Sequence, residues 1–152
     1  MSEFDFQYCQ KIIVFSTDLK SVLLCKRKGE NDYDGVYSFI GGKMEHKDGS
    51  FIEGLRREKN EEIGEGAKVE IYPLFATNVL FRKKSSDMMV LPHYYARYLE
   101  GEIKLNEEYS DFQWVAIEEL EAFEPKIPTV SDMVNEILKL TKVISPTDLV
   151  QI

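Results

Sequence analysis

Apolar residues in the N-terminal part of the chain come in short, unbroken runs, which are typical of strands. Residues 11–17 (KIIVFST) and 21–26 (SVLLCK) are rich in aliphatic and β-branched side chains and are separated by only three residues. We predict a strand pair here, with the first strand covered on both faces because its apolar run is continuous. A polar loop at 29–35 then leads to a brief strand at 36–40, which ends on a pair of glycines.

Two longer apolar stretches follow, at 69–81 and 88–99, joined by a polar turn. They predict a long hairpin. Pro73 and Pro92 within it predict bulges or edge positions, because proline cannot donate to a strand ladder. A further short strand is predicted at 111–115 (DFQWV).

Helix signals occur at three places. Ser50 followed by Glu53 has the spacing of a capping box, so a helix is expected to begin near Ser50 and to end at Gly64. A similar threonine and aspartate signal begins an amphipathic pattern over 129–141, which predicts a helix that closes the domain. A short helical turn is predicted at 117–122.

The helix that begins at Ser50 carries an acidic face beside an apolar one. Side chains repeat every 3.6 residues, so the acidic face contains Glu58, Glu61, Glu62 and Glu65, and the apolar stripe contains Ile52, Leu55 and Ile63. Carboxylates this close repel one another, whereas Mg²⁺ would turn the repulsion into coordination. A solvated acidic face is the alternative interpretation. The glycine pair just before the helix favours the metal site, because backbone approaches a ligand closely there.

Composition and charge narrow the class of protein. The 152 residues are 43% hydrophobic and 30% charged, which is ordinary for one globular domain, and the net charge of −8 disfavours nucleic acid or an anionic membrane as partner. The chain lacks a membrane span, and its first residues lack a secretion signal, so we expect it in the cytoplasm. Cys9 and Cys25 are too few for a disulfide scaffold and have no zinc spacing with the two histidines.

From Gly42 to Gly64 the sequence resembles the Nudix box, G-x5-E-x7-R-E-U-x-E-E-x-G-U, in which U is a bulky aliphatic residue. The matching residues are Gly42, Arg57, Glu58, Glu61, Glu62 and Gly64. Residues 41–45 (GGKME) match the glycine-rich turn of this family, and 114–120 (WVAIEEL) resemble its later strand and short helix. The resemblance implies an α/β fold, the Nudix-type α/β/α sandwich with a central mixed β-sheet, as a single domain over 1–152.

The box departs from the family pattern at three positions. The loop acid is Asp48, and it is separated from Arg57 by eight residues instead of seven, so the loop contains a one-residue insertion. Lys59 occupies an aliphatic position, where we expect its stem to pack while the ammonium reaches outward or pairs with an acid. Glu65 replaces the last aliphatic residue. The carboxylates of the acidic face are all retained.

Nudix enzymes hydrolyse a nucleoside diphosphate linked to another group X, and the resemblance implies this reaction with Mg²⁺ or Mn²⁺ as cofactor. The metal neutralises developing charge and lowers the pKa of bound water. The resemblance to the Nudix box implies that Glu58 and Glu62 are the main metal ligands. It also implies that Glu61 shares the site and that the Gly41 carbonyl adds an oxygen ligand. Arg57, one turn before Glu61, is expected to orient that carboxylate.

The general base has several candidates. It is either one of the helix glutamates or an acid in the loop before the Trp114 strand, where Glu107 and Glu108 are available. Solvated loop acids are the alternative interpretation of that pair.

Substrate-binding candidates lie around the glycine pair. Lys43 is expected to meet a phosphate, and Glu45 and Phe39 belong to the predicted substrate-binding set. Phe39 is a candidate for stacking on a base, as are Tyr37 and Phe81, although core packing is the commoner role of such residues. The basic run at 82–84 either steers an anion to the site or is a solvated hairpin tip.

The turn at 39–43 (FIGGK) resembles that of MutT-like nucleoside triphosphate pyrophosphohydrolases, which release a nucleoside monophosphate and pyrophosphate. Hydrolases of ADP-ribose or dinucleoside polyphosphates are other branches. A Nudix-fold nucleotide-binding or sensor module with weak catalysis is the alternative, motivated by Lys59 and the insertion. Messenger-RNA decapping is disfavoured by the charge of −8. We expect a small-molecule nucleotide as partner, no nucleic acid or membrane, and a monomer or homodimer.

Overall fold

The structure is a computed structural model that describes residues 5–152. Residues 1–4, part of the segment in which we expect no secretion signal, lie outside the described residues. The strands are β1 (Phe6–Phe15), β2 (Ser21–Arg27), β3 (Tyr37–Ser38), β4 (Ile40–Lys43), β5 (Lys68–Ile71), β6 (Thr77–Arg82), β7 (Met88–Glu100), β8 (Tyr109–Ala116) and β9 (Val150–Gln151). The helices are α1 (Phe51–Ile63) and α2 (Val130–Leu140), with 3₁₀ turns η1 (Ile117–Glu119) and η2 (Pro146–Asp148).

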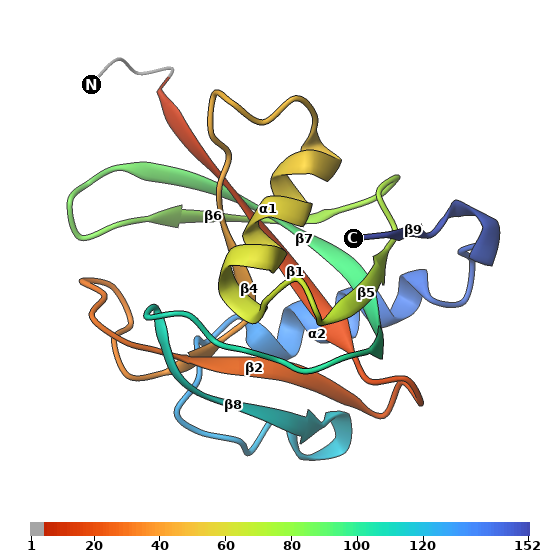
Figure 1. The fold of residues 1–152 in the computed structure, drawn as a ribbon. Coiled ribbons are helices and arrows are strands. Elements are labelled where there is room, and N and C mark those ends of the chain that lie inside the picture. The colour runs from red at the N-terminus through yellow and green to blue at the C-terminus, as the bar shows by residue number, and fades with distance from the viewer. Residues whose placement is uncertain (1–4) are drawn as a thin grey trace.

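The strands form one mixed, nine-stranded sheet that forks (Figure 1). β1 pairs with β2 where Phe15 meets Val22, and the two strands then diverge. On one branch β1 pairs with β4 and, in parallel, with β7, while on the other branch β2 pairs with β3 and β8. Residues from both branches, among them Lys11 of β1 and Arg27 of β2, line the cavity that holds the candidate site.

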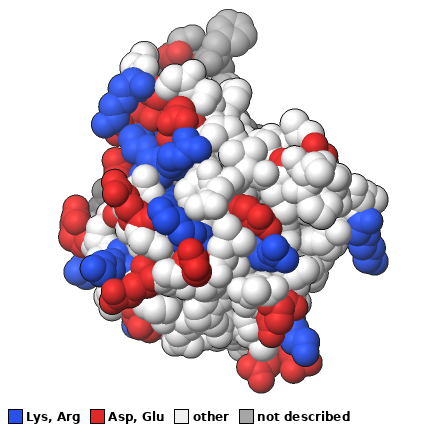
Figure 2. Space-filling model, turned by 45° about the vertical axis from the view of Figure 1, so that its right-hand side comes forward, with Lys and Arg blue, Asp and Glu red and all other residues white. Residues whose placement is uncertain are grey.

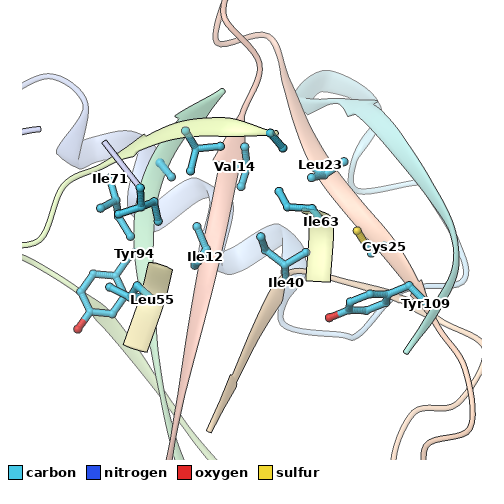
Figure 3. Close-up of a cluster of buried hydrophobic side chains, with 14 residues drawn as sticks. Ile12, Val14, Leu23, Cys25, Ile40, Leu55, Ile63, Ile71, Tyr94 and Tyr109 are labelled. Carbon is cyan, nitrogen blue, oxygen red and sulfur yellow. The ribbon is translucent and has the colours of Figure 1, made fainter. Parts of the chain in front are cut away.

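The two helices cover opposite faces of the sheet, as the α/β/α sandwich requires. Alternate residues of β1 point to opposite layers: Ile12 and Val14 join the cluster that contains α1, whereas Ile13 and Phe15 join the cluster that contains α2. Figure 3 shows Leu55 of α1 in the first cluster. All four strand residues are fully buried, which confirms the prediction that this strand is covered on both faces. Each such side chain contributes roughly 1.5–3 kcal/mol to stability.

Several strand boundaries differ from the sequence prediction. The first strand begins five residues earlier than residue 11, because Phe6–Gln10 pair with β7 and β4. The brief strand expected at 36–40 is divided into β3 and β4, which join opposite branches of the fork. The strand expected at 111–115 is confirmed as part of the longer β8.

The hairpin expected from 69–81 and 88–99 is interrupted in its first arm. β5 ends at Ile71 and β6 begins at Thr77, with Pro73 in the gap, yet both strands pair with β7. Pro92 lies inside β7, opposite Asn78 of β6. It is therefore not at an edge. The ladder with β1 skips from Val90 to His93, where proline offers no amide hydrogen.

Both predicted helices are confirmed, and their caps differ in detail. α1 begins after Ser50, whose hydroxyl accepts a hydrogen bond from the Glu53 amide at 3.1 Å, while the Glu53 carboxylate pairs with Arg56 instead of closing the capping box. α2 begins after Thr129, but the threonine side chain makes no capping bond. The expected turn at 117–122 is the shorter η1.

The helix α2 is not the last element, contrary to the prediction. η2 and β9 follow it, and β9 pairs with β5 at the sheet edge. A two-residue strand carries no periodicity, so the sequence pattern could not indicate it. Within residues 5–152, no helix has the length and apolar character needed to cross a membrane.

Candidate functional site

A cavity of about 1280 Å³ opens in the fork of the sheet. One wall is acidic and comes from the loop after β4, from α1 and from the segment before β8. The acidic residues of this wall are Glu45, Glu58, Glu61, Glu62 and Glu108, and the loop between β2 and β3 adds Glu30 and Asp32 to the cavity lining. The opposite walls come from β6, β7 and the residues that precede α2.

Helix α1 presents three of its four predicted acids to this cavity. The helix ends at Ile63, and Gly64 adopts a φ of 93°, which favours glycine, while its amide donates to the Asn60 carbonyl at 3.1 Å. Glu65 therefore follows the helix end and is not among the cavity residues. The prediction that Glu65 shares the acidic face is wrong, because the helical period stops before it.

Glu62 is the most enclosed of the acids, with 3% of its surface exposed. Its carboxylate accepts hydrogen bonds from the Gly41 amide at 2.5 Å and from the Tyr109 hydroxyl at 3.1 Å. Burial raises the pKa of Glu62 well above its usual value. The nearby charge of Lys11 and the hydrogen bond from Gly41 oppose this rise, whereas the hydrogen bond with the Glu108 carboxyl adds to it. This carboxylate is thus fixed in place but short of positive charge.

Gly41 shows why glycine is needed beside Glu62. Its φ is 135°, and a Cβ atom there would lie 2.0 Å from the backbone oxygen of Gln10. Any side chain would therefore force β4 away from β1. The predicted ligand at this residue was the carbonyl oxygen, whereas the contact in the structure is made by the amide.

Glu58 is also buried and lies against the next glycine. A Cβ atom on Gly42 would lie 2.3 Å from a carboxylate oxygen of Glu58, so the absence of a side chain makes room for this acid. Burial raises the pKa of Glu58, and Arg57, whose Nη1 lies 2.9 Å from Oε1 of Glu58, opposes the shift.

Arg57 connects the loop and the helix. It forms two parallel hydrogen bonds to Asp48, at 2.8 and 2.9 Å, and donates to the Lys43 carbonyl at 3.0 Å. Its Nη1 also lies 3.3 Å from Glu61 and 3.6 Å from Glu45. Arg57 holds the pKa of Asp48 at about 2. The inserted residue is therefore absorbed in the turn, because Asp48 still reaches the arginine.

Lys59 is buried, and its ammonium does not reach outward or pair with an acid as predicted. It is 1% exposed, and Nζ donates to the carbonyls of Ala67 at 3.0 Å and Gly64 at 3.5 Å. The lysine thus binds backbone oxygens at and beyond the C-terminus of α1, where positive charge is favourable. Burial lowers the pKa of Lys59 to about 8.

The predicted substrate-binding residues divide into two groups. Lys43, Glu45 and Phe81 line the cavity. Phe39 is 3% exposed and packs edge-on against His93 in the α2 cluster, so the prediction that its ring stacks on a base is wrong. Tyr37 is likewise buried, with its hydroxyl on Asp111 at 2.5 Å.

Of the two loop acids, Glu108 lines the cavity and Glu107 does not. The Asn106 side chain accepts a hydrogen bond from the Glu108 backbone amide at 3.0 Å and donates one to the Glu108 carboxylate at 3.3 Å. These two bonds orient the Glu108 side chain. The sequence pattern alone did not distinguish the two.

Tyr109, Lys11 and Tyr33 also line the cavity and were missed by sequence reasoning. Lys11 stands at the start of an apolar strand, and this misplaced charge was an available signal. Tyr109 and Tyr33 gave no signal, because their role depends on contacts with distant segments.

The donor set suits a hard divalent cation. Glu58 and Glu62 are buried carboxylates that share one cavity wall, and oxygen donors of this kind are what Mg²⁺ and Mn²⁺ prefer. Across residues 5–152, no three acidic, histidine or cysteine side chains are already converged on one metal position. The reason is that Glu58 and Glu61 are drawn to Arg57, while Glu62 is held by Gly41 and Tyr109.

Comparisons with known proteins agree with this geometry. The family model described as NUDIX domain matches residues 7–135. Among solved structures, a MutT protein from Methanosarcina mazei Go1 superposes with a TM-score of 0.73 at 20% identity, over 93% of this chain and 99% of that one. A MutT NUDIX hydrolase from Burkholderia pseudomallei superposes with a TM-score of 0.71 at 19% identity, over 88% of this chain and 98% of that one.

A third solved structure, an Ap4A hydrolase from C. elegans in a binary complex, gives a TM-score of 0.72 at 11% identity, over 91% of this chain and 99% of that one. At such identities these structures establish the fold and no more. No curated protein matches the chain closely enough to count as a relative.

The family match covers most of the chain and includes the whole glycine turn, helix and carboxylate set described above. The chain belongs to the NUDIX family. It is a hydrolase that acts on acid anhydrides in phosphorus-containing compounds.

Proposed function

We propose that this protein is a metal-dependent nucleoside triphosphate pyrophosphohydrolase, which releases a nucleoside monophosphate and pyrophosphate. The observation that carries the proposal is the pair of buried carboxylates, Glu58 and Glu62, that face a nucleotide-sized cavity beside Gly41 and Gly42. Arg57 offsets part of the charge on Glu58, but Glu62 is buried with little compensating charge, which is costly unless a cation binds it.

In this proposal Glu58 and Glu62 would hold Mg²⁺ or Mn²⁺. Glu61 and the Gly41 carbonyl would be the other ligands that the protein supplies. The bound metal supplies Lewis-acid stabilisation of the phosphate oxygens and a lowered pKa for water. Arg57 positions Glu58 and Glu61, since it lies within 3.3 Å of both. Tyr109 fixes the orientation of Glu62 through its hydroxyl.

Glu108 serves as the general base. It lines the cavity beside Glu62, so it is placed to take a proton from water as the water oxygen attacks phosphorus. The attack is at the α-phosphorus: the bond from this phosphorus to the oxygen that bridges it to the β-phosphorus breaks, that oxygen leaves with pyrophosphate, and the water oxygen stays on the nucleoside monophosphate. Glu61, which is exposed and held by Arg57, is the second candidate for this role.

The phosphate chain lies along the turn after β4. Lys43 has its side chain exposed there, and we assign it a phosphate contact. Glu45 is paired with Lys47 at 3.1 Å and lies near Arg57, so its part in substrate binding is to shape this wall.

The sensor-module alternative rested on Lys59 and the loop insertion. Both are accommodated, by the Ala67 carbonyl and by the Asp48–Arg57 pair, which supports the enzyme. ADP-ribose and dinucleoside polyphosphates remain the other substrate branches. A single domain over 1–152, a monomer or homodimer, and a cytoplasmic location stay predictions.

Replacing Glu62 with Gln tests the metal role. We expect pyrophosphate release from nucleoside triphosphates to fall by more than about 100-fold, because a neutral amide cannot replace the charged ligand. Without metal, the variant should be at least as stable as the wild type, since a charge that is costly to bury is removed. Mg²⁺ should raise the melting temperature of the wild type and leave that of Glu62→Gln unchanged.

Glu65→Gln is the matched control, because Glu65 lies outside the cavity on the same segment. It should retain both turnover and the Mg²⁺ response. Full hydrolysis by Glu62→Gln would rule out the proposed ligand.

A further inference from the structure

Two segments that are distant in sequence meet at the rim of the cavity: the loop between β2 and β3, and the end of β6 with the turn that follows it. The loop between β2 and β3 contributes Tyr33, and β6 contributes Phe81, with ring centroids 5.9 Å apart and a 38° tilt. The Lys84 amide donates to the Asp32 carboxylate at 3.1 Å, which joins the same two segments. In Figure 1 both segments, orange and green, lie on the left side of the molecule.

The Tyr33 loop is held in an uncommon conformation. Tyr33 has a φ of 54°, in the left-handed region that few residues other than glycine adopt. Arg27 supports it by donating from Nε to the Tyr33 carbonyl and from Nη2 to the Asp32 carbonyl, both at 3.2 Å. This support keeps an aromatic side chain, 41% exposed, at the wall of the cavity.

The same rim carries two lysines, Lys83 and Lys84, beside two acids of the loop between β2 and β3, Glu30 and Asp32. Lys83 and Lys84 line the cavity, and in the described part of the chain neither side chain forms an ion pair. The two acids have other partners, because Glu30 lies 3.5 Å from Arg27 and the Asp32 carboxylate accepts from the Lys84 amide. The two ammonium groups are therefore available to a ligand. Such groups suit a phosphate rather than a second cation.

We propose that this rim, made of Tyr33, Phe81, Lys83 and Lys84, is the nucleotide-recognition subsite, an inference that rests on the proposed function. The nucleobase stacks on Tyr33, which Phe81 supports from behind, and the two lysines attract the phosphate chain that reaches the acidic wall. Aromatic stacking accepts any base, because every base offers a flat ring face. The rim therefore selects nucleotides over inorganic pyrophosphate more than it selects one base.

The test is calorimetric binding of α,β-methylene nucleoside triphosphates with Mg²⁺, which cannot be cleaved at the proposed bond, and of inorganic pyrophosphate. Tyr33→Ala should weaken binding of the nucleotide analogues about tenfold and leave pyrophosphate binding unchanged. Tyr33→Phe keeps the ring and should bind like the wild type. A Lys83→Ala, Lys84→Ala double variant should weaken both ligands and flatten their salt dependence.

Phe75→Ala is the control, because Phe75 is an exposed aromatic residue that does not line the cavity. Equal losses in Tyr33→Ala and Phe75→Ala, or a loss in Tyr33→Ala that is as large for pyrophosphate as for nucleotides, would overturn the subsite. Because binding is read without turnover, the subsite stands if nucleotides bind through Tyr33 but are not hydrolysed, and the proposed function alone then fails.

Discussion

At the scale of single residues, Lys59 occupies a position that the family pattern gives to an aliphatic side chain. Its four-carbon stem lies among buried residues of α1, and its ammonium binds the Ala67 carbonyl just before β5. The side chain therefore links the end of the helix to the next strand. This link buries the positive charge of the ammonium, which is unfavourable. Burial therefore lowers the pKa of Lys59 to about 8.

Because the pKa of Lys59 is lowered, we predict that the folded protein becomes more stable as the pH rises above neutral. The unfolded chain holds the Lys59 proton up to its ordinary pKa of 10.5, whereas the folded chain releases it at about 8. Between these values the unfolded state binds more protons, so the free energy of unfolding rises with pH. Relative to Lys59→Met, which cannot titrate, the wild type should gain about 2 kcal/mol between pH 7 and pH 10.

Urea unfolding of both proteins across that range measures the difference. The exposed residue Lys139 provides the control, and Lys139→Met should run parallel to the wild type. A difference between wild type and Lys59→Met that does not change with pH would contradict the assigned burial of the ammonium.

At the scale of elements, the loop between β4 and α1 packs tightly on the helix. A Cβ atom on Gly54 would lie 2.5 Å from the Met44 sulfur, 2.9 Å from Oε1 of Gln10 and 3.2 Å from Asp48. Gly54 thus gives up helix propensity so that the loop can approach. The same approach allows Asp48 to reach Arg57 in spite of the inserted residue.

Gly54→Ala should therefore destabilise the protein although alanine is the better helix former. The propensity gain is about 1 kcal/mol, but crowding in a packed region costs typically 1–3 kcal/mol and moves the Asp48 loop. We expect a net loss of about 1 kcal/mol in urea unfolding. Gly49→Ala meets no atom within 4 Å and should be neutral, and a Gly54→Ala variant more stable than the wild type would disprove the tight packing.

At the scale of the whole molecule, residues of both branches of the sheet line the cavity, and the segment that includes β9 and Ile152 reinforces one branch. The Ile152 amide donates to the Val69 carbonyl at 2.9 Å, and its buried side chain joins the α1 core. In Figure 2, acidic and basic side chains gather along parts of the displayed face and leave a broad uncharged area, so this face has no continuous basic patch.

The C-terminal contribution is measurable. Ile152→Ala should lower the free energy of unfolding by about 2 kcal/mol, because it removes a buried side chain from the core. Val143→Ala, at an exposed apolar residue, should cost less than about 0.5 kcal/mol. Equal stability of the two variants would show that the last strand does not contribute to the core.

The sequence by itself determined the helix α1, its two ends and the spacing of its carboxylates, because caps and the helical period are local properties. It also indicated the family. The prediction failed where an outcome depended on strand pairing, as in the division of 69–81 and the short strand β9.

Only the tertiary structure decided which acids face the cavity, where Lys59 places its charge, and which aromatic rings stay accessible. Tyr109 meets Glu62 across 47 residues of sequence, and Lys84 meets Asp32 across 52. Such contacts follow from the forked sheet, which brings distant segments together after every local element has formed. The physical reason is that chain reversal and strand pairing, rather than local propensity, set the distances between them.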